Sequence, residues 1–190
     1  PSAVFCADCL QGMTESPILI ESPDAPFERA VAVGSYEGAL RTAILKLKYN
    51  RQTWLAQPLG DLLAEAARQH LDIPDIIVPV PLYPLRSRER GFNQAELLAR
   101  VVGRTLHRPV ISGNLQRTRP TVAQSALGRS ERADNVAGAF RLARPGELTG
   151  ARILLVDDVH TTGVTVTECA NVLLESGAVR TQVCVLASGK

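Results

Sequence analysis

The sequence predicts an α/β protein whose core is an open parallel sheet with helices on both faces. Three short apolar runs, residues 75–80, 153–156 and 181–187, are rich in branched aliphatic residues and typical of buried parallel strands. Residues 164–176 have apolar side chains at helical spacing, and Gly177 stands where a glycine commonly ends a helix. Strand, helix and strand in this order form a βαβ unit, from which parallel sheets are built. Ligands of such sheets bind beyond the carboxyl ends of the strands.

The other elements follow from the same periodicities. The patterns predict a strand over 30–36 and helices over 39–49, 58–70 and 94–106. Residues 1–30 are rich in Pro, Ser and acids, which predicts a loop-like appendage. The stretch 116–140 has no clear period, and so long a loop inside a compact domain is usually functional or mobile. We therefore expect an appendage over 1–30 and one main domain over 31–190.

Composition limits the class of protein. The chain has 190 residues, 45% hydrophobic and 21% charged, which suits one globular domain. No apolar run approaches the length of about 20 residues that spans a bilayer, so we expect no membrane insertion. The first ten residues lack the charged start and apolar centre of a signal peptide. The four cysteines do not suggest a disulfide framework, which favours a cytoplasmic location.

Positive charge is concentrated in the middle of the chain. From Arg86 to Arg144 there are twelve arginines and four acids, so this segment carries +8 and the rest of the chain −6. Such a segment suits a polyanionic ligand, although a solvated surface biased toward arginine explains the charge equally well. We interpret Arg86, Arg88 and Arg90 as a polyanion patch that would contact single-stranded DNA or another polyanion. Phe92 beside them is either a stacking ring or, as we prefer, a core residue.

The most informative segment follows the predicted strand 153–156. Asp157 and Asp158 lead through Val159 and His160 into Thr161-Thr162-Gly163-Val164-Thr165 and the next predicted helix. Gly163 permits a tight turn, while the amides at the helix start and the threonine hydroxyls favour an anion. The two acids would repel a phosphate beside them and suit sugar hydroxyls or a hydrated Mg²⁺ instead. The segment therefore predicts a site for a ribose 5-phosphate.

A polar strand end followed by a helix cap is the simpler alternative. A cap requires one Ser or Thr, whereas this segment has paired acids and three threonines. The chain has no GxGxxG after a strand and no GxxxxGK[ST], so competing nucleotide motifs are absent from the sequence. We therefore favour ligand binding.

Several segments resemble a known family. VDDVHTTGVT, residues 156–165, is similar to the motif with which type I phosphoribosyltransferases bind 5-phosphoribosyl 1-pyrophosphate (PRPP). VPVPLYPLRSRERGFNQAELLA, residues 78–99, resembles more narrowly the competence-protein ComF family, as do QSALGRSERADNVAGAF at 124–140 and YEGALRTAILKLKY at 36–49. The resemblance covers most of the chain. It implies the type I phosphoribosyltransferase fold, with residues 31–74 as a hood and 75–190 as the core.

The resemblance also implies roles for individual residues. Asp157 and Asp158 would hold the ribose hydroxyls, one of them through Mg²⁺, and residues 161–165 would bind the 5-phosphate. The turn at Pro81 and Leu82 would be the pyrophosphate loop. Residues 117–136 would be the flap that closes over the site. The flap arginines that we expect to bind pyrophosphate are Arg117, Arg119, Arg129 and Arg132.

Two classes of function stay open. The first is an enzyme that displaces pyrophosphate from the ribose anomeric carbon, with Mg²⁺ and arginine stabilising the leaving group. The second is a protein that binds PRPP or a nucleotide without turnover and acts in DNA uptake during natural transformation. The resemblance implies single-stranded DNA, a competence helicase or a translocation protein as partner, and a homodimer is compatible with both classes. Thr161 stands where purine-salvage relatives usually have an Asp that assists the base nitrogen, although pyrimidine-type relatives also have Thr there, so no catalytic residue is assigned.

One pair of cysteines stands at metal-ligand spacing. Cys6 and Cys9 form a CxxC, half of a four-thiolate zinc site. ComF-like proteins commonly have two such pairs near the N-terminus, and this sequence contains one. A Zn²⁺ ion would need ligands from elsewhere, so we favour free thiols.

Overall fold

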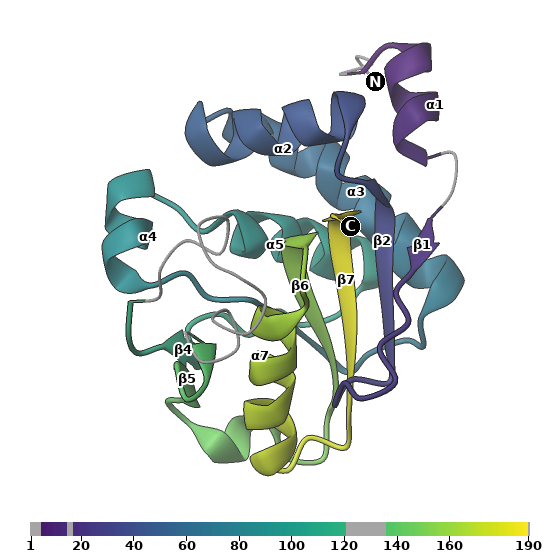
Figure 1. Ribbon diagram of the computed structural model, residues 1–190. Helices are drawn as coiled ribbons and strands as arrows, with labels where there is room; N and C mark the ends of the chain where they lie inside the picture. The colour runs from purple at the N-terminus through teal and green to yellow at the C-terminus, as the bar shows by residue number, and fades with distance from the viewer. Residues whose placement is uncertain (1–4, 15–16, 121–135, 190) are drawn as a thin grey trace.

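The computed structural model describes residues 5–14, 17–120 and 136–189, which form one central sheet with helices on both faces (Figure 1). Within these residues the sheet has the strand order β1-β2-β7-β6-β3. The strand bounds are β1 Ile18–Leu19, β2 Arg29–Ser35, β3 Ile76–Pro79, β6 Arg152–His160 and β7 Arg180–Ser188. The β2–β7, β7–β6 and β6–β3 pairs are parallel, and β1 is antiparallel to β2. The predicted α/β fold with a largely parallel sheet is confirmed.

Two buried layers hold the helices on the sheet. One face is covered by α2 (Gly38–Tyr49), α3 (Ala56–His70) and α5 (Gln94–Leu106). The other is covered by α7 (Val164–Glu175) and by the hairpin of β4 (Leu115–Arg117) and β5 (Phe140–Leu142). Side chains of β6 alternate between these layers, since Leu154 and Val156 pack with the α2–α3–α5 layer. Ile153 and Leu155 pack with the α7 layer, as a strand with two buried faces requires.

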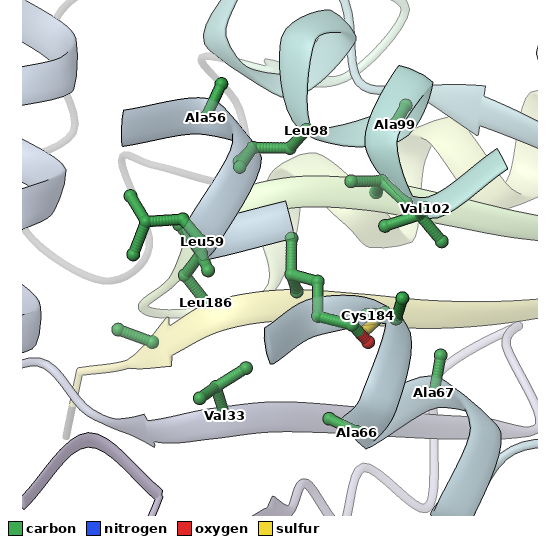
Figure 2. Packing of buried hydrophobic residues seen from close by; sticks show 14 of the residues in the cluster. Val33, Ala56, Leu59, Ala66, Ala67, Leu98, Ala99, Val102, Cys184 and Leu186 are labelled. Atoms are coloured by element: carbon green, nitrogen blue, oxygen red, sulfur yellow. The ribbon is translucent and has the colours of Figure 1, made fainter. Parts of the chain in front are cut away.

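The α2–α3–α5 layer is packed closely. Figure 2 shows Leu59 of α3 and Leu98 of α5 near Leu186 of β7 in the interior between the helices and the sheet. Helices α3 and α5 touch at a glycine, because a Cβ added at Gly60 would lie 2.4 Å from the Cβ of Val101. The small residue therefore permits the short distance between the two helices.

Two helices lie where no helix was predicted. Helix α4 (Pro84–Arg90) occupies the expected arginine-rich loop, and α1 (Ala7–Thr14) lies in the expected appendage. No residue of α4 is buried, so this helix has no apolar stripe for a periodicity to detect. It begins with Pro84 at its first turn and ends at Gly91 with φ +85°, both common at helix ends.

Strand β6 is longer than the apolar run that predicted it. It continues from Val156 through both acids to His160, because its pairing with β7 extends as far as His160 and Ser188. The expected strand end at Val156 is therefore wrong: tertiary pairing outweighs the low strand preference of aspartate.

The expected division into appendage, hood and core stays a prediction. In the structure, β2 of the hood segment pairs with β7, and α3 of that segment packs on α5. Phe27 and β1 from the first thirty residues also join the sheet and its core. Among the described helices, none is both long and apolar enough to cross a bilayer.

Candidate functional site

The predicted phosphate loop lies at the carboxyl end of a central strand. β6 is flanked by β7 and β3, and its last residue leads through residues 161–163 into α7. Gly163 precedes the first turn of α7 with φ +76°, a left-handed conformation that favours glycine. A Cβ at Gly163 would lie 2.7 Å from Nε2 of His160, so the imidazole packs directly against the turn. The sequence segment thus forms the strand, turn and helix start that a phosphate site requires.

The two acids point to opposite faces of the sheet. Successive side chains of a strand alternate, so Asp158 shares the face of Val156 and Asp157 that of Leu155. Asp158 therefore faces the α2–α3–α5 layer and is only 4% exposed. Asp157 faces the α7 side and accepts a hydrogen bond at 2.8 Å from the backbone N–H of Asp158. The acids are neighbours, but each has its own surroundings.

Asp158 is paired with a lysine from a distant segment. Nζ of Lys48, on α2, lies 2.9 Å from Oδ1 of Asp158. Burial lowers the pKa of Lys48, but the charges of Asp158 and Asp157 outweigh this and hold that pKa above its usual value. Lys48 is therefore charged, and it brings the hood segment into contact with the strand end.

Of the two acids, Asp157 is the one whose charged form is disfavoured. Its burial, together with the charge of Asp158, raises the pKa of Asp157 to about 7. The positive charges of Lys48 and Arg117 act in the opposite direction but do not cancel this effect. A group that binds at this strand end with hydrogen-bond donors or positive charge would relieve the repulsion.

Three buried polar atoms of the segment 157–165 have no hydrogen-bond partner within the described part of the chain: Oδ2 of Asp158, Nε2 of His160 and the hydroxyl of Thr162. Buried polar atoms are normally satisfied, so unpaired ones call for an explanation, such as a ligand or a water. A carboxylate oxygen suits a ribose hydroxyl or a hydrated Mg²⁺, which usually binds through one or two carboxylates. The donor set therefore fits the predicted ion and sugar.

The predicted pyrophosphate loop lies at the same edge of the sheet. Pro81 and Leu82 follow β3, which is parallel to β6, so the two loops leave neighbouring strand ends. Asn93 stabilises this turn, because its side-chain N–H donates to the carbonyl of Val80 at 3.0 Å. The Oδ1 of Asn93 also accepts from the backbone N–H of Ala95 at 3.1 Å, which caps α5.

A cleft of about 880 Å³ adjoins this turn, between α4 and the β4–β5 hairpin. Pro81 and Leu82 line it, as do the arginines Arg88, Arg117 and Arg141. Among the described residues that line it, the one acid is Glu96, which forms an ion pair with Arg100 at 2.6 Å. The cleft is therefore positively charged.

The three arginines of the predicted polyanion patch do not all face solvent in the structure. Arg86 and Arg88 are exposed on α4, whereas Arg90 turns inward over the ring of Tyr49, 5.4 Å from its centroid, and hydrogen-bonds to Gln94. Phe92 packs against the core, so the prediction that it is a core residue is confirmed.

The expected flap arginines are only partly described. Arg117 lies over the ring of Phe140, 5.4 Å from its centroid, and burial together with the charge of Arg86 lowers its pKa. Arg119 donates to the carbonyl of Ala137 across the base of the hairpin. Arg129 and Arg132 lie outside the described residues.

Cys6 and Cys9 lie at the start of α1. The backbone N–H of Cys9 donates to Sγ of Cys6 at 3.4 Å, and this contact lowers the pKa of the exposed Cys6 thiol. Among the described residues, no group of three His, Cys, Asp or Glu side chains could hold a metal ion. The CxxC therefore gains no third ligand from that part of the chain.

Lys48 is the site residue that sequence reasoning missed. The periodicity placed it on a helix, and the helix is there. Its partner Asp158 stands far along the chain, and only the packing of α2 on the sheet brings the two together. The nearest signal in the sequence was a lysine next to the apolar stripe of a helix in the hood.

Comparison with solved structures shows that the fold is the type I phosphoribosyltransferase fold. The chain superposes on glutamine phosphoribosylpyrophosphate amidotransferase from Bacillus subtilis, solved with ADP and GMP, with a TM-score of 0.50. The identity is 17%, over 74% of this chain and 30% of that one, so the likeness concerns the fold alone. No protein-family model matches the chain.

Two curated relatives are much more similar in sequence. The DNA utilization protein YhgH of Escherichia coli (strain K12) is 41% identical over 163 residues, 83% of this chain and 71% of that protein. Competence protein F of Haemophilus influenzae is 34% identical over 191 positions, 97% of this chain and 79% of that protein. The chain therefore belongs to the ComF family of competence proteins.

Proposed function

We propose that this protein binds PRPP together with Mg²⁺ at the end of β6 and serves DNA uptake or DNA utilisation in the cytoplasm. The observation that carries the binding proposal is a group of buried polar atoms beside the helix start at Gly163 that have no partner among the described residues. They include Oδ2 of Asp158 and the hydroxyl of Thr162. The link to DNA is supported by the names of the relatives, a DNA utilization protein and a competence protein.

The ligand matches the site group by group. The 5-phosphate would lie on the amides and hydroxyls of residues 161–165, since a helix N-terminus favours an anion. Asp157 and Asp158 would hold the ribose hydroxyls, one of them through Mg²⁺. The pyrophosphate would extend toward Pro81 and the arginines of the cleft, Arg88 and Arg117. Bound Mg²⁺ would supply positive charge to the pyrophosphate oxygens.

Turnover, where it occurs, is a substitution at the ribose anomeric carbon. The bond from C1 to the pyrophosphate oxygen breaks, pyrophosphate leaves with the electron pair, and an acceptor nucleophile forms the new bond to C1. Arginine side chains such as Arg117 stabilise the charge that develops on the leaving group. His160 is a poor proton acceptor for this step, because burial lowers its pKa and its ring packs against Gly163.

Calorimetry tests the binding proposal. PRPP with millimolar Mg²⁺ is titrated into the wild type, Asp158→Asn and the control Asp61→Asn, which changes an exposed carboxylate on α3. We expect Asp158→Asn to weaken binding by about tenfold or more, the effect of losing one charge-assisted hydrogen bond. Equal affinities in all three proteins would refute the site. Pyrophosphate release with a panel of bases then separates an enzyme from a binding protein.

A second candidate function is direct contact with single-stranded DNA. It is favoured by the exposed Arg86 and Arg88 and by the positively charged cleft that Arg88 and Arg141 line. A gel-shift titration at low salt with an oligo-dT strand tests it, because phosphate contacts are strongest there. Absence of a shifted band at low salt would exclude it.

A further inference from the structure

The ion pair of Lys48 and Asp158 is unusual in its position. The lysine side chain is 17% exposed and the aspartate side chain 5%, so both charges have left most of their water. Lys48 comes from the last turn of α2, which is anchored in the core by the buried Ile44 and Leu47. The ammonium group is therefore held at the strand end by a rigid helix.

Stability alone does not account for this pair. A buried ion pair is often no more stabilising than apolar residues of the same size, because desolvation offsets the attraction. The pair here is also incomplete, since Oδ2 of Asp158 is buried without a partner within the described part of the chain. A pair selected only for structure would satisfy both oxygens.

We propose that Lys48 is the resident cation of this acidic site, which a divalent cation must displace from Asp158. Mg²⁺ and an ammonium group compete for the same carboxylate, because two positive charges on it repel each other. Lys48 should therefore oppose a divalent cation that arrives alone. Once displaced, its charge becomes available to an anionic ligand that arrives with the metal.

The second half of this inference rests on the proposed function. The anion that we assign to the site is the pyrophosphate of PRPP, and Lys48 would then stabilise it. The same residue thus weakens the binding of the bare metal and strengthens the binding of the metal with its polyphosphate. These opposite effects on the two affinities distinguish a displaceable cation from a residue with a structural role only.

The first experiment uses Mn²⁺ alone as a spectroscopic substitute for Mg²⁺. Free Mn²⁺ is measured by electron paramagnetic resonance in titrations of the wild type, Lys48→Met and the control Lys46→Met. Lys46 lies on the same helix with its side chain exposed. We expect Lys48→Met to bind Mn²⁺ about tenfold more tightly than the wild type, since a nearby repelling charge is removed. Lys46→Met should match the wild type.

The second experiment titrates PRPP with Mg²⁺ into the same three proteins. Lys48→Met should bind it about tenfold more weakly, the loss of one charge-assisted contact. Mn²⁺ affinity in Lys48→Met that equals or falls below the wild-type value would overturn the displacement. Unchanged PRPP affinity in that variant would overturn the second role of Lys48.

Two further controls keep the outcomes separate. Thermal melting checks that Lys48→Met folds, and Lys48→Gln, which keeps an N–H donor without the charge, replaces it if it does not. A wild type that binds no PRPP would refute the proposed function and with it the second role of Lys48. The Mn²⁺ comparison would still decide whether Lys48 occupies the cation position.

Discussion

At the end of β6, Asp157 and Asp158 are adjacent in sequence, but their carboxylates lie in different electrostatic surroundings. Asp158 is matched by the ammonium group of Lys48 at 2.9 Å. Asp157 accepts one backbone hydrogen bond, and its pKa is raised to about 7 by burial and by the neighbouring carboxylate. A raised pKa means that the charged form is disfavoured in the folded protein. The charged form of Asp157 is therefore unfavourable in the folded protein, and a ligand that brings positive charge or hydrogen-bond donors would stabilise it.

This asymmetry predicts a pH-dependent effect of Asp157→Asn. The folded protein holds the Asp157 proton more tightly than the unfolded chain, whose ordinary pKa is 3.8. The stability that this provides is fully present below about pH 4 and is lost as the pH rises to about 7. Asp157→Asn, which cannot ionise, should therefore be more stable than the wild type at pH 8 by about 1–3 kcal/mol. Urea unfolding at pH 8 and at pH 4 measures the difference, which should nearly vanish at the lower pH.

Asp61→Asn serves as the control for that comparison, because its carboxylate lies exposed on α3. As an exposed surface substitution, it should differ in stability from the wild type by no more than a few tenths of a kcal/mol. A wild type that is more stable than Asp157→Asn at pH 8 would contradict the assigned surroundings of Asp157.

The turn at Gly163 gives a second prediction at the residue scale. Alanine there would adopt a φ of +76° and place its Cβ 2.7 Å from Nε2 of His160. We expect Gly163→Ala to lose about 1–3 kcal/mol of stability and to bind PRPP measurably more weakly. Thermal melting and calorimetry measure the two effects. Gly146→Ala is the matched control, since nothing lies within 4 Å of its added Cβ, and equal losses in both variants would contradict the account.

Among the elements, α3 and α5 determine how closely the helical layer covers the sheet. Gly60 of α3 meets Val101 of α5 with no room for a methyl group. Gly60→Ala should therefore destabilise the protein by about 2–3 kcal/mol, although alanine is the better helix former. Urea unfolding measures this. Gly12→Ala in α1, where the added Cβ meets nothing within 4 Å, should be neutral or slightly stabilising; a similar loss there would show that packing is not the cause.

The elements also show what a single sequence can predict. Strands β2, β3 and β7 and helices α2, α3, α5 and α7 were found because burial imposes a regular apolar spacing on them. The glycine that ends α7 was predicted for the same local reason, and Gly177 has a left-handed φ of +93°. Helix α4 was missed because none of its residues is buried. The length of β6 was missed because its last residues pair with β7 regardless of their own preference.

The candidate site follows the same rule. The loop from Asp157 to Thr165 was predicted because its residues are contiguous and their chemistry is specific. The pairing with Lys48 depends on how α2 lies on the sheet. The opposite orientation of the two acids depends on the continuation of β6 through them, which pairing with β7 imposes. Neither is written in a local pattern.

At the scale of the whole molecule, folding brings arginines of the basic segment together in one place. Arg88 and Arg141 come from α4 and β5, yet they line one cleft beside the predicted pyrophosphate loop. If this cleft takes a phosphodiester backbone, replacing both with alanine should weaken binding of oligo-dT. The slope of log K against log salt concentration should also decrease in magnitude by about one unit for each phosphate contact that is lost. Fluorescence anisotropy over a range of salt concentrations measures this.

Arg68→Ala is the control for the salt titration, because Arg68 pairs with Glu65 on α3 at 2.7 Å. Its salt dependence should equal that of the wild type. An unchanged slope in the Arg88→Ala/Arg141→Ala variant would show that the cleft does not contact the nucleic acid.

The central claim is that a sugar phosphate binds at the end of β6, and electron density for a non-hydrolysable PRPP analogue in crystals of the protein with Mg²⁺ tests it most directly. We expect the 5-phosphate on the amides of residues 163–165, with ribose hydroxyls within hydrogen-bond distance of Asp157 or Asp158. Ordered analogue in the cleft between α4 and the hairpin, with the loop of Thr161 to Thr165 empty, would contradict it.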